Sequence, residues 1–150
     1  MRVVRLINVD LIRDVIANPR VWVYNDHAPD RATWVPDVVN QTWLALLAGD
    51  PESLRGVVVA QKRSSIEANV RIAFKPEHWG SPDNVALGRL AVRWLYDQGM
   101  YKLTGVIPDT NKAALRLAQR VGFRREGINR KSIRIDGEWR DQMYVGMFLE

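Results

Sequence analysis

The chain has 150 residues, 47% of them hydrophobic and 26% charged, which is the size and composition of a single globular domain spanning residues 1–150. It has no cysteine and only two histidines, so disulfides and thiolate zinc sites are excluded and a metal centre is not expected. A net charge of +5 favours an acidic partner, and coenzyme A, a nucleic acid and an acidic protein would each fit. The first residues lack the apolar core of a signal peptide, and no apolar run is long enough to span a bilayer, so we expect a cytoplasmic protein.

The N-terminal third predicts alternating strands and helices. Residues 3–6 form a short β-type run, after which Asn8 or Asp10 is suited to cap a helix that ends at Asn18-Pro19. Residues 21–24 (VWVY) are again β-type because β-branched and aromatic residues dominate them.

Turn-forming residues then precede a second predicted helix. Residues 25–31 are rich in Asp, His and Pro and predict a loop. Pro36 is suited to the first turn of a helix, and the pattern of residues 37–47 predicts a helix that ends at Gly49-Asp50-Pro51.

The middle of the chain predicts two strands followed by a helix. Residues 56–61 (GVVVAQ) indicate a buried strand, and residues 66–74 alternate with period two. A loop over residues 75–84 follows, and residues 85–97 have the spacing of an amphipathic helix that Gly99 closes. One face of the second strand is apolar; its residues are Ile66, Ala68, Val70, Ile72 and Phe74.

The last third predicts a strand, a helix and a hairpin. The strand covers residues 103–107, and the helix covers residues 112–121 and ends at Gly122. The hairpin has arms over about 128–135 and 139–149, joined by Asp136-Gly137, a strong type I′ turn signal. The chain is therefore expected to be α/β, with a central, mixed, mostly antiparallel sheet of six or seven strands, about four flanking helices and a C-terminal β-hairpin.

The stretch from Asn111 to Glu126 (NKAALRLAQRVGFRRE) resembles a motif of the GNAT acetyltransferases, in which an asparagine opens a helix and a Gly-Phe pair follows eleven residues later, here Gly122-Phe123. The DGEWRD segment at residues 136–141 is similar to the ribosomal-protein-type branch of that superfamily. The resemblance covers residues 56–150 well and the first fifty only loosely. It implies the GNAT fold and an N-acetyltransferase that moves an acetyl group from acetyl-CoA to a primary amine by direct transfer in a ternary complex.

The resemblance also implies where acetyl-CoA binds. In the family the fourth strand splays from the fifth, the pantetheine arm lies along the fourth strand, and the diphosphate lies on amides at the N-terminus of the next helix, where the helix dipole favours negative charge. Here the fourth strand is residues 66–74. The implied cofactor-binding residues are Ile72, Ala73, Phe74, Lys75, Trp79, Gly80, Ser81, Asn84, Val85 and Asn111. Asn111 would either bind pantetheine or hold the turn as a cap.

The diphosphate loop departs from the family pattern. The pattern has Gln or Arg at its first position and Gly or Ala at its last, whereas this chain has Glu77 and Pro82 there and keeps only Gly80. A proline removes one amide donor, and Glu77 adds negative charge near a diphosphate. Either the affinity for the cofactor is reduced, or Asp83 or Asn84 caps the helix and presents the amides along another path.

The acids familiar from the family are also absent. A tyrosine seven residues after the asparagine, or a serine three residues after it, protonates the departing thiolate, and here these positions are Ala118 and Ala114. Water can take this role, or a tyrosine from elsewhere can serve. The candidates are Tyr144, Tyr101 and Tyr24.

Glu67 is the candidate base. It shares one strand face with Asn69 and Arg71, and three polar residues on a covered strand are explained if that face lines a wet cleft. The alternative is an ordinary surface charge. His78 is a candidate phosphate contact and His27 a candidate for the acceptor pocket, while Trp22, Trp34 and Trp43 fit either the acceptor wall or the core.

Two other function classes stay open. One is a GNAT-fold binding module that has lost catalysis, which the missing acids favour. The other is a nucleic-acid-binding protein, because eight basic residues fall between Arg116 and Arg140. A homodimer is a further expectation, since the final strand, YVGMFLE, is apolar enough to pair across two copies.

Overall fold

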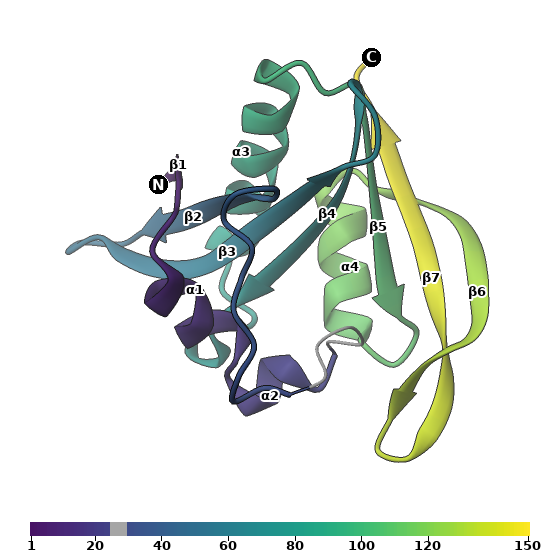
Figure 1. Cartoon of the computed structure of the whole chain (residues 1–150). Helices are drawn as coiled ribbons and strands as arrows, with labels where there is room; N and C mark the ends of the chain where they lie inside the picture. The colour runs from purple at the N-terminus through teal and green to yellow at the C-terminus, as the bar shows by residue number, and fades with distance from the viewer. Residues whose placement is uncertain (25–29) are drawn as a thin grey trace.

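A computed structural model describes residues 1–24 and 30–150 and folds them around one seven-stranded sheet (Figure 1). The strand order is β1-β2-β3-β4-β5-β7-β6, and every neighbouring pair is antiparallel except β4 and β5. Along the chain the elements are β1 (Arg2–Arg5), α1 (Val9–Ile16), α2 (Pro19–Trp22), β2 (Thr42–Ala48), β3 (Ser53–Lys62), β4 (Glu67–Phe74), a 3₁₀ turn (Pro76–His78), α3 (Asp83–Asp97), β5 (Lys102–Pro108), α4 (Lys112–Val121), β6 (Arg124–Ile135) and β7 (Glu138–Phe148). The expected mixed α/β sheet with a C-terminal hairpin is confirmed.

Helices cover both faces of the sheet, because successive strand residues point to opposite sides. On one face, Val58 of β3 and Phe74 of β4 pack with Leu87 and Ala91 of α3 and with residues of α4. On the other face, Val57 packs with the buried side chains of α1. The predicted apolar face of β4 lies on the α3 and α4 side, and its polar face lies on the α1 side.

The sequence signals for α1, α4 and the hairpin are confirmed. Asn8 caps α1 by accepting a hydrogen bond from the backbone N–H of Leu11, at 3.1 Å. Helix α4 ends at Gly122, whose φ of 131° suits only glycine. At the tip of the hairpin, Asp136 and Gly137 both have positive φ, as a type I′ turn requires.

Two predictions for the first fifty residues are wrong. Residues 37–47 were expected to be a helix, but β2 occupies Thr42–Ala48 in the interior of the sheet, with both faces covered. Residues 21–24 were expected to be a strand, but Asn18 caps a new helix with Pro19 in its first turn, and α2 ends at Trp22. Residues 25–29 of the expected loop lie outside the described residues.

The final strand lies inside the sheet. Strand β7 pairs with β5 on one side and with β6 on the other, so its backbone is already hydrogen-bonded along both edges. It therefore cannot add to a second copy in the expected way, and any dimer would form through another surface.

Strands β4 and β5 separate soon after they meet. Only residues 67–69 of β4 pair with residues 102–104 of β5, although both strands continue to Phe74 and Pro108. Figure 1 shows the two strands diverging from their common end. The sheet is therefore open between the second halves of β4 and β5.

Close packing of β3 on β4 at Gly56 gives a test of the fold. A Cβ atom at Gly56 would lie 2.3 Å from the carbonyl oxygen of Ala73 and 2.9 Å from Cδ1 of Phe74. We expect Gly56→Ala to lower the free energy of unfolding by about 1–3 kcal/mol, because the backbone must shift to admit it. Gly127→Ala is the matched control, since its Cβ would lie an ordinary 3.5 Å from Tyr144. Equal unfolding free energies for the two variants in urea would contradict this packing.

Candidate functional site

A cavity of about 620 Å³ lies between the diverging strands and the helices α3 and α4. Nine of the ten predicted cofactor-binding residues line it: Ile72, Ala73, Phe74, Trp79, Gly80, Ser81, Asn84, Val85 and Asn111. Lys75 does not line it, and its backbone N–H donates to the carbonyl of Arg55 on β3, at 2.9 Å. The structure thus brings together residues from β4, the loop after it, α3 and α4.

The backbone of β4 alternates between its two neighbours. Since the N–H of Lys75 points to β3, the N–H of Ala73 does so as well, and the amides of Ile72 and Phe74 point the other way, into the gap. Strand β5 is too far away there to pair with them. The carbonyl of Phe74 accepts a hydrogen bond from Nε1 of Trp79, at 2.9 Å. Ile72 and Phe74 therefore present main-chain donors to the cavity.

The loop before α3 is held in place from several sides. Gly80 has a φ of 78° and lines the cavity. The guanidinium of Arg20 on α2 lies 4.7 Å from the ring centre of Trp79, a cation–π contact. Nη1 of Arg55 donates to Nδ1 of His78, at 3.0 Å, which leaves only Nε2 of this histidine for a ligand. These contacts fix the loop that carries Glu77 and Pro82, the two residues that depart from the family pattern.

The cap of α3 differs from the expectation. Pro82 is the N-cap, so neither Asp83 nor Asn84 caps the helix with its side chain. Instead Ser81 accepts from both backbone amides, Oγ from Asp83 at 3.3 Å and the carbonyl from Asn84 at 3.2 Å. Proline fits here because an N-terminal position of a helix needs no N–H of its own.

Asn84 is a buried polar residue at the edge of the cavity. Only 7% of it is exposed, and its Nδ2 donates to the carbonyl of His78, at 3.0 Å. Its Oδ1 is buried and has no hydrogen-bond partner among the described residues. A buried acceptor without a partner is costly, so this oxygen is suited to receive a donor from a ligand in the cavity.

Asn111 holds the start of α4. Its Oδ1 accepts from the backbone N–H of Ala114, at 3.3 Å, so the cap role left open by the sequence is observed. The same residue lines the cavity. Contact with a ligand remains a prediction.

The predicted catalytic residues lie on the opposite face of the sheet from the α3 and α4 core. Glu67 is half-buried at the start of β4, in register with Lys102 of β5 and outside the cavity lining. Nδ2 of Asn69 donates to Oγ1 of Thr104, at 3.4 Å, where the pairing of β4 and β5 ends. Arg71 follows on the same face and lines the cavity, so this face reaches the cavity through the gap.

An ion pair crosses β7 on that face. Nζ of Lys102 contacts Oε2 of Glu126 on β6. The two side chains meet over Gly146, where any Cβ would collide with the carboxylate of Glu126. Lys102, which is in register with Glu67, is therefore paired with Glu126.

The three candidate tyrosines lie in different places. Tyr144 is 41% exposed on β7, in register with Val106, and Tyr101 stacks on Phe148. Only Tyr24, which follows α2, lines the cavity. Ala114 and Ala118 line it as well, so the positions of the two missing acids face the cavity.

The three tryptophans that the sequence assigns either to the acceptor wall or to the core pack together. Trp22, Trp34 and Trp43 form two edge-to-face contacts, with ring centres 5.6 and 6.3 Å apart, and Trp43 is buried, so this cluster belongs to the core. His27 lies outside the described residues.

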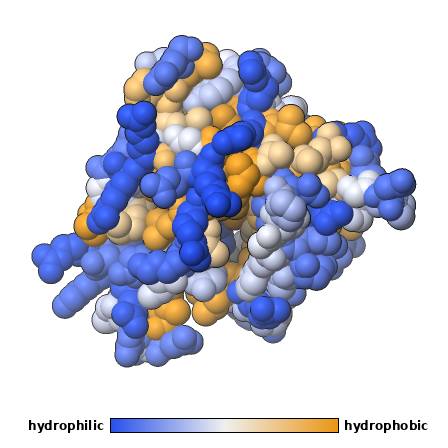
Figure 2. All heavy atoms as spheres, turned by 180° about the vertical axis from the view of Figure 1, so that it is seen from behind, coloured by the Kyte–Doolittle hydropathy of each residue, from blue (hydrophilic) through white to orange (hydrophobic). Residues whose placement is uncertain are grey.

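The basic residues between 116 and 140 are spread over several elements. Arg116 and Arg120 on α4 line the cavity, whereas Arg134 lies over the ring of Trp139 and Arg140 pairs with Glu138 on the hairpin. Figure 2 shows long hydrophilic side chains on one face with apolar atoms visible between them. The basic residues of this stretch therefore form no single surface: some line the cavity and others lie on the hairpin.

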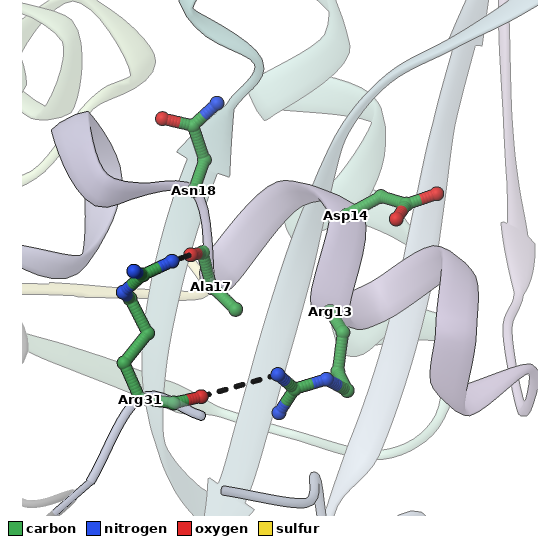
Figure 3. A pocket seen from close by; sticks show the side chains of 5 residues that line it. All are labelled: Arg13, Asp14, Ala17, Asn18 and Arg31. Carbon is green, nitrogen blue, oxygen red and sulfur yellow. Dashed lines mark hydrogen bonds between the residues drawn. The ribbon is translucent and has the colours of Figure 1, made fainter. Parts of the chain in front are cut away.

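A second depression, of about 300 Å³, lies beside α1 (Figure 3). Its two arginines are occupied with main-chain carbonyls: Arg31 donates to Ala17 at 3.0 Å, and Arg13 donates to Arg31 at 3.1 Å and to Trp34. These bonds tie the segment after residue 30 to α1. The depression is therefore part of the packing and not a candidate site.

The small residues that create the cavity were not predicted from the sequence. Gly88 and Ala91 on α3 and Ala113 on α4 line it, together with Ala114 and Ala118. Small residues at intervals of three or four on two neighbouring helices were the signal, because such faces leave room where larger side chains would fill it. In the described part of the chain no three His, Asp or Glu side chains gather as a metal site, and no helix there is long and apolar enough to cross a membrane.

The two roles of Asn111 can be separated by substitution. We expect Asn111→Ala to lower the free energy of unfolding by about 1 kcal/mol, because the cap of α4 is lost. Asn111→Asp keeps an oxygen that accepts from Ala114 and should leave stability nearly unchanged. Thermal unfolding of both variants measures the difference. Equal destabilisation by Ala and Asp would show that Oδ1 is not the cap.

Comparison with known proteins bears on the fold. No family model matches the sequence, and no curated protein does. Among solved structures, a spermidine N-acetyltransferase from Vibrio cholerae in complex with CoA and spermine aligns with a TM-score of 0.82 and 16% identity over 97% of this chain and 94% of that one. An acetyltransferase of the GNAT family from Streptococcus pneumoniae aligns with a TM-score of 0.63 and 24% identity over 73% of this chain and 68% of that one. The chain therefore has the fold of GNAT acetyltransferases.

Proposed function

We propose that the protein is an acetyl-CoA-dependent N-acetyltransferase that acts on a primary amine. The observation that carries the proposal is the gap between β4 and β5, where the amides of Ile72 and Phe74 face a cavity that the N-terminus of α3 also borders. Main-chain donors and a helix N-terminus together suit an amide-rich arm ending in a diphosphate. The solved neighbour that contains CoA has the same fold, which supports this placement.

In the proposed complex the pantetheine arm lies along β4 and the diphosphate lies at the N-terminus of α3. Ile72 and Phe74 would pair with the arm, and Oδ1 of Asn84 would accept from one of its N–H or hydroxyl groups. Arg116 and Arg120 lie at the cavity and would attract the phosphates. Lys75 is left out of this arrangement because its N–H bonds to β3.

The chemistry is direct transfer in a ternary complex. The amine nitrogen attacks the thioester carbon, the oxygen becomes negatively charged, and the carbon–sulfur bond then breaks to release the thiolate of coenzyme A. An N–H of Ile72 or Phe74 would stabilise the oxyanion. Glu67 lies about 16 Å from Ile72 along β4, farther than one water can bridge, so it would take the amine's proton through a relay of several water molecules.

Two tyrosines, besides water, are candidates for the acid that protonates the departing thiolate. Tyr144 lies on the same sheet face as Glu67, whereas Tyr24 is the candidate tyrosine that lines the cavity. The ribosomal-protein-type resemblance of residues 136–141 supports a protein amine as acceptor. Spermine is bound in a solved neighbour, which supports a small polyamine instead.

A binding module without turnover is the second candidate, and Ala114 and Ala118 favour it, because both positions of the familiar acids carry no proton donor. Release of free thiol from acetyl-CoA, measured with a panel of primary amines, separates the two functions. Turnover supports the enzyme, and binding without thiol release with any amine supports the module.

Acetyl-CoA binding can be tested with two matched glycine variants. Gly80 and Gly99 both have positive φ, and a Cβ at either meets open space, so alanine strains both backbones similarly. Only Gly80 lines the cavity. We expect isothermal titration to show micromolar acetyl-CoA binding that Gly80→Ala weakens about five- to thirtyfold and Gly99→Ala leaves nearly unchanged, since about 1–2 kcal/mol of loop strain opposes binding only at Gly80.

Equal weakening by both variants would mean that the loop before α3 is not the binding element. No binding at millimolar acetyl-CoA would contradict the proposed function as a whole.

A further inference from the structure

The closed end of the gap between β4 and β5 carries a hydrogen-bonded pair of side chains. Nδ2 of Asn69 donates to Oγ1 of Thr104, at 3.4 Å. The two residues are the last register pair of the two strands, and both are half-buried. They share the polar face of the sheet with Glu67, so the pair lies between Glu67 and the opening.

This pair divides the distance that a proton has to cover between the gap and Glu67. Along β4, Asn69 is two residues, about 7 Å, from Glu67 and three residues, about 10 Å, from Ile72. One water that bonds to two polar atoms spans about 5.5 Å between them. A polar group at the position of the pair therefore shortens the chain of waters on both sides.

Of the two side chains, only the hydroxyl of Thr104 is suited to pass a proton on. A hydroxyl has one hydrogen to donate and two lone pairs that accept. The bond from Asn69 occupies one lone pair, which leaves the other lone pair and the hydrogen for water. Oγ1 can therefore take a proton from one water while its own hydrogen moves to another, and Asn69 fixes its orientation.

Two carboxylates lie near Thr104, and only one of them is open to a proton. The neighbour of Thr104 on β7 is Gly146, and the carboxylate of Glu126 lies where a Cβ of this glycine would be. That carboxylate is paired with Lys102. The carboxylate of Glu67 has no hydrogen bond or ion pair within the described part of the chain.

We infer that Thr104 relays the proton of the acceptor amine to Glu67, with Asn69 as its positioning residue. The ammonium loses one proton through water to Oγ1, and the hydrogen of Oγ1 moves through a second chain of water to Glu67, which returns it to solvent. The neutral nitrogen then attacks the thioester. Its second proton leaves as the carbon–sulfur bond breaks and ends on the thiolate. This inference rests on the proposed function and specifies the path of its proton.

The test compares kcat/KM for the amine among variants of one threonine. The panel holds n-butylamine, spermine and a peptide that begins with alanine, and the amine with the highest turnover is the probe, followed by release of free thiol. Thr104→Val keeps the shape and loses the hydroxyl, so we expect a loss of about tenfold or more at pH 7. Thr104→Ser restores the hydroxyl and should come within about threefold of the unchanged protein. If the valine variant does not fold, Thr104→Ala takes its place.

Thr42→Val is the matched control. Thr42 is half-buried on a strand as Thr104 is, but it lies on β2 and does not line the cavity. It should keep kcat/KM within about twofold. Titration with acetyl-CoA should give the same Kd for all variants within about twofold, because none of them changes a group that faces the cofactor.

The pH dependence separates a relay from a structural role. An amine with the pKa of a lysine side chain, about 10.4, is almost fully protonated at pH 7 and arrives increasingly neutral as the pH rises. The loss in Thr104→Val should therefore shrink to below about threefold at pH 9.5. The substitution changes none of the charged or titratable side chains around it on the polar face, which are Glu67, Arg71, Lys102, Glu126 and Tyr144.

The remaining results would overturn the inference. An unchanged kcat/KM in Thr104→Val at pH 7, or a loss of the same size at both pH values, would show that Thr104 relays no proton and would leave the proposed function standing. Failure of the unchanged protein to release thiol with any amine of the panel would contradict both.

Discussion

The loss of hydrogen bonding between β4 and β5 is the constraint on which the rest of the site depends. The two strands pair over three residues each and then diverge, so the sheet keeps its core at one end and opens at the other. Backbone amides inside a sheet are normally paired, and an open edge is stable only if another group meets it. Here the groups facing the opening are the amides of Ile72 and Phe74, above a cavity that α3 and α4 enclose.

The opening also joins the two faces of the sheet. One face carries the cavity between α3 and α4, and the other carries Glu67, Asn69 and Arg71 of β4, which are the polar residues that a covered strand would not otherwise keep. A donor bound in the cavity and an acceptor on the polar face would meet at the gap without passing through the core. Hydrogen bonds fix this geometry from outside the gap, from Trp79 to the end of β4 and from Asn69 to Thr104 at its closed end.

Most of the second half of the fold was predictable because its signals are local and agree with one another: a capping asparagine, a terminal glycine and a type I′ turn leave little choice. Strand β2 was not predictable, because a strand covered on both faces is a continuous apolar run without the alternation of apolar and polar residues that marks a strand. Pro36 and Asp37 added to the error, because Asp37 accepts from the amides of Val39 and Asn40 as a helix cap would, yet closes only a turn. Nine of the ten residues that the resemblance implies for the cofactor line one cavity, and the exception is Lys75, whose amide pairs with β3.

Hydrogen exchange of the β4 amides tests the central claim most directly. By nuclear magnetic resonance, the amides of Arg71 and Ala73, which face β3, should exchange slowly in the free protein, and those of Ile72 and Phe74 should exchange faster. Saturating acetyl-CoA should slow exchange at Ile72 and Phe74 by at least tenfold and leave Arg71 and Ala73 unchanged. Uniform protection along β4 in the free protein, or no change at Ile72 and Phe74 with the ligand bound, would contradict the account.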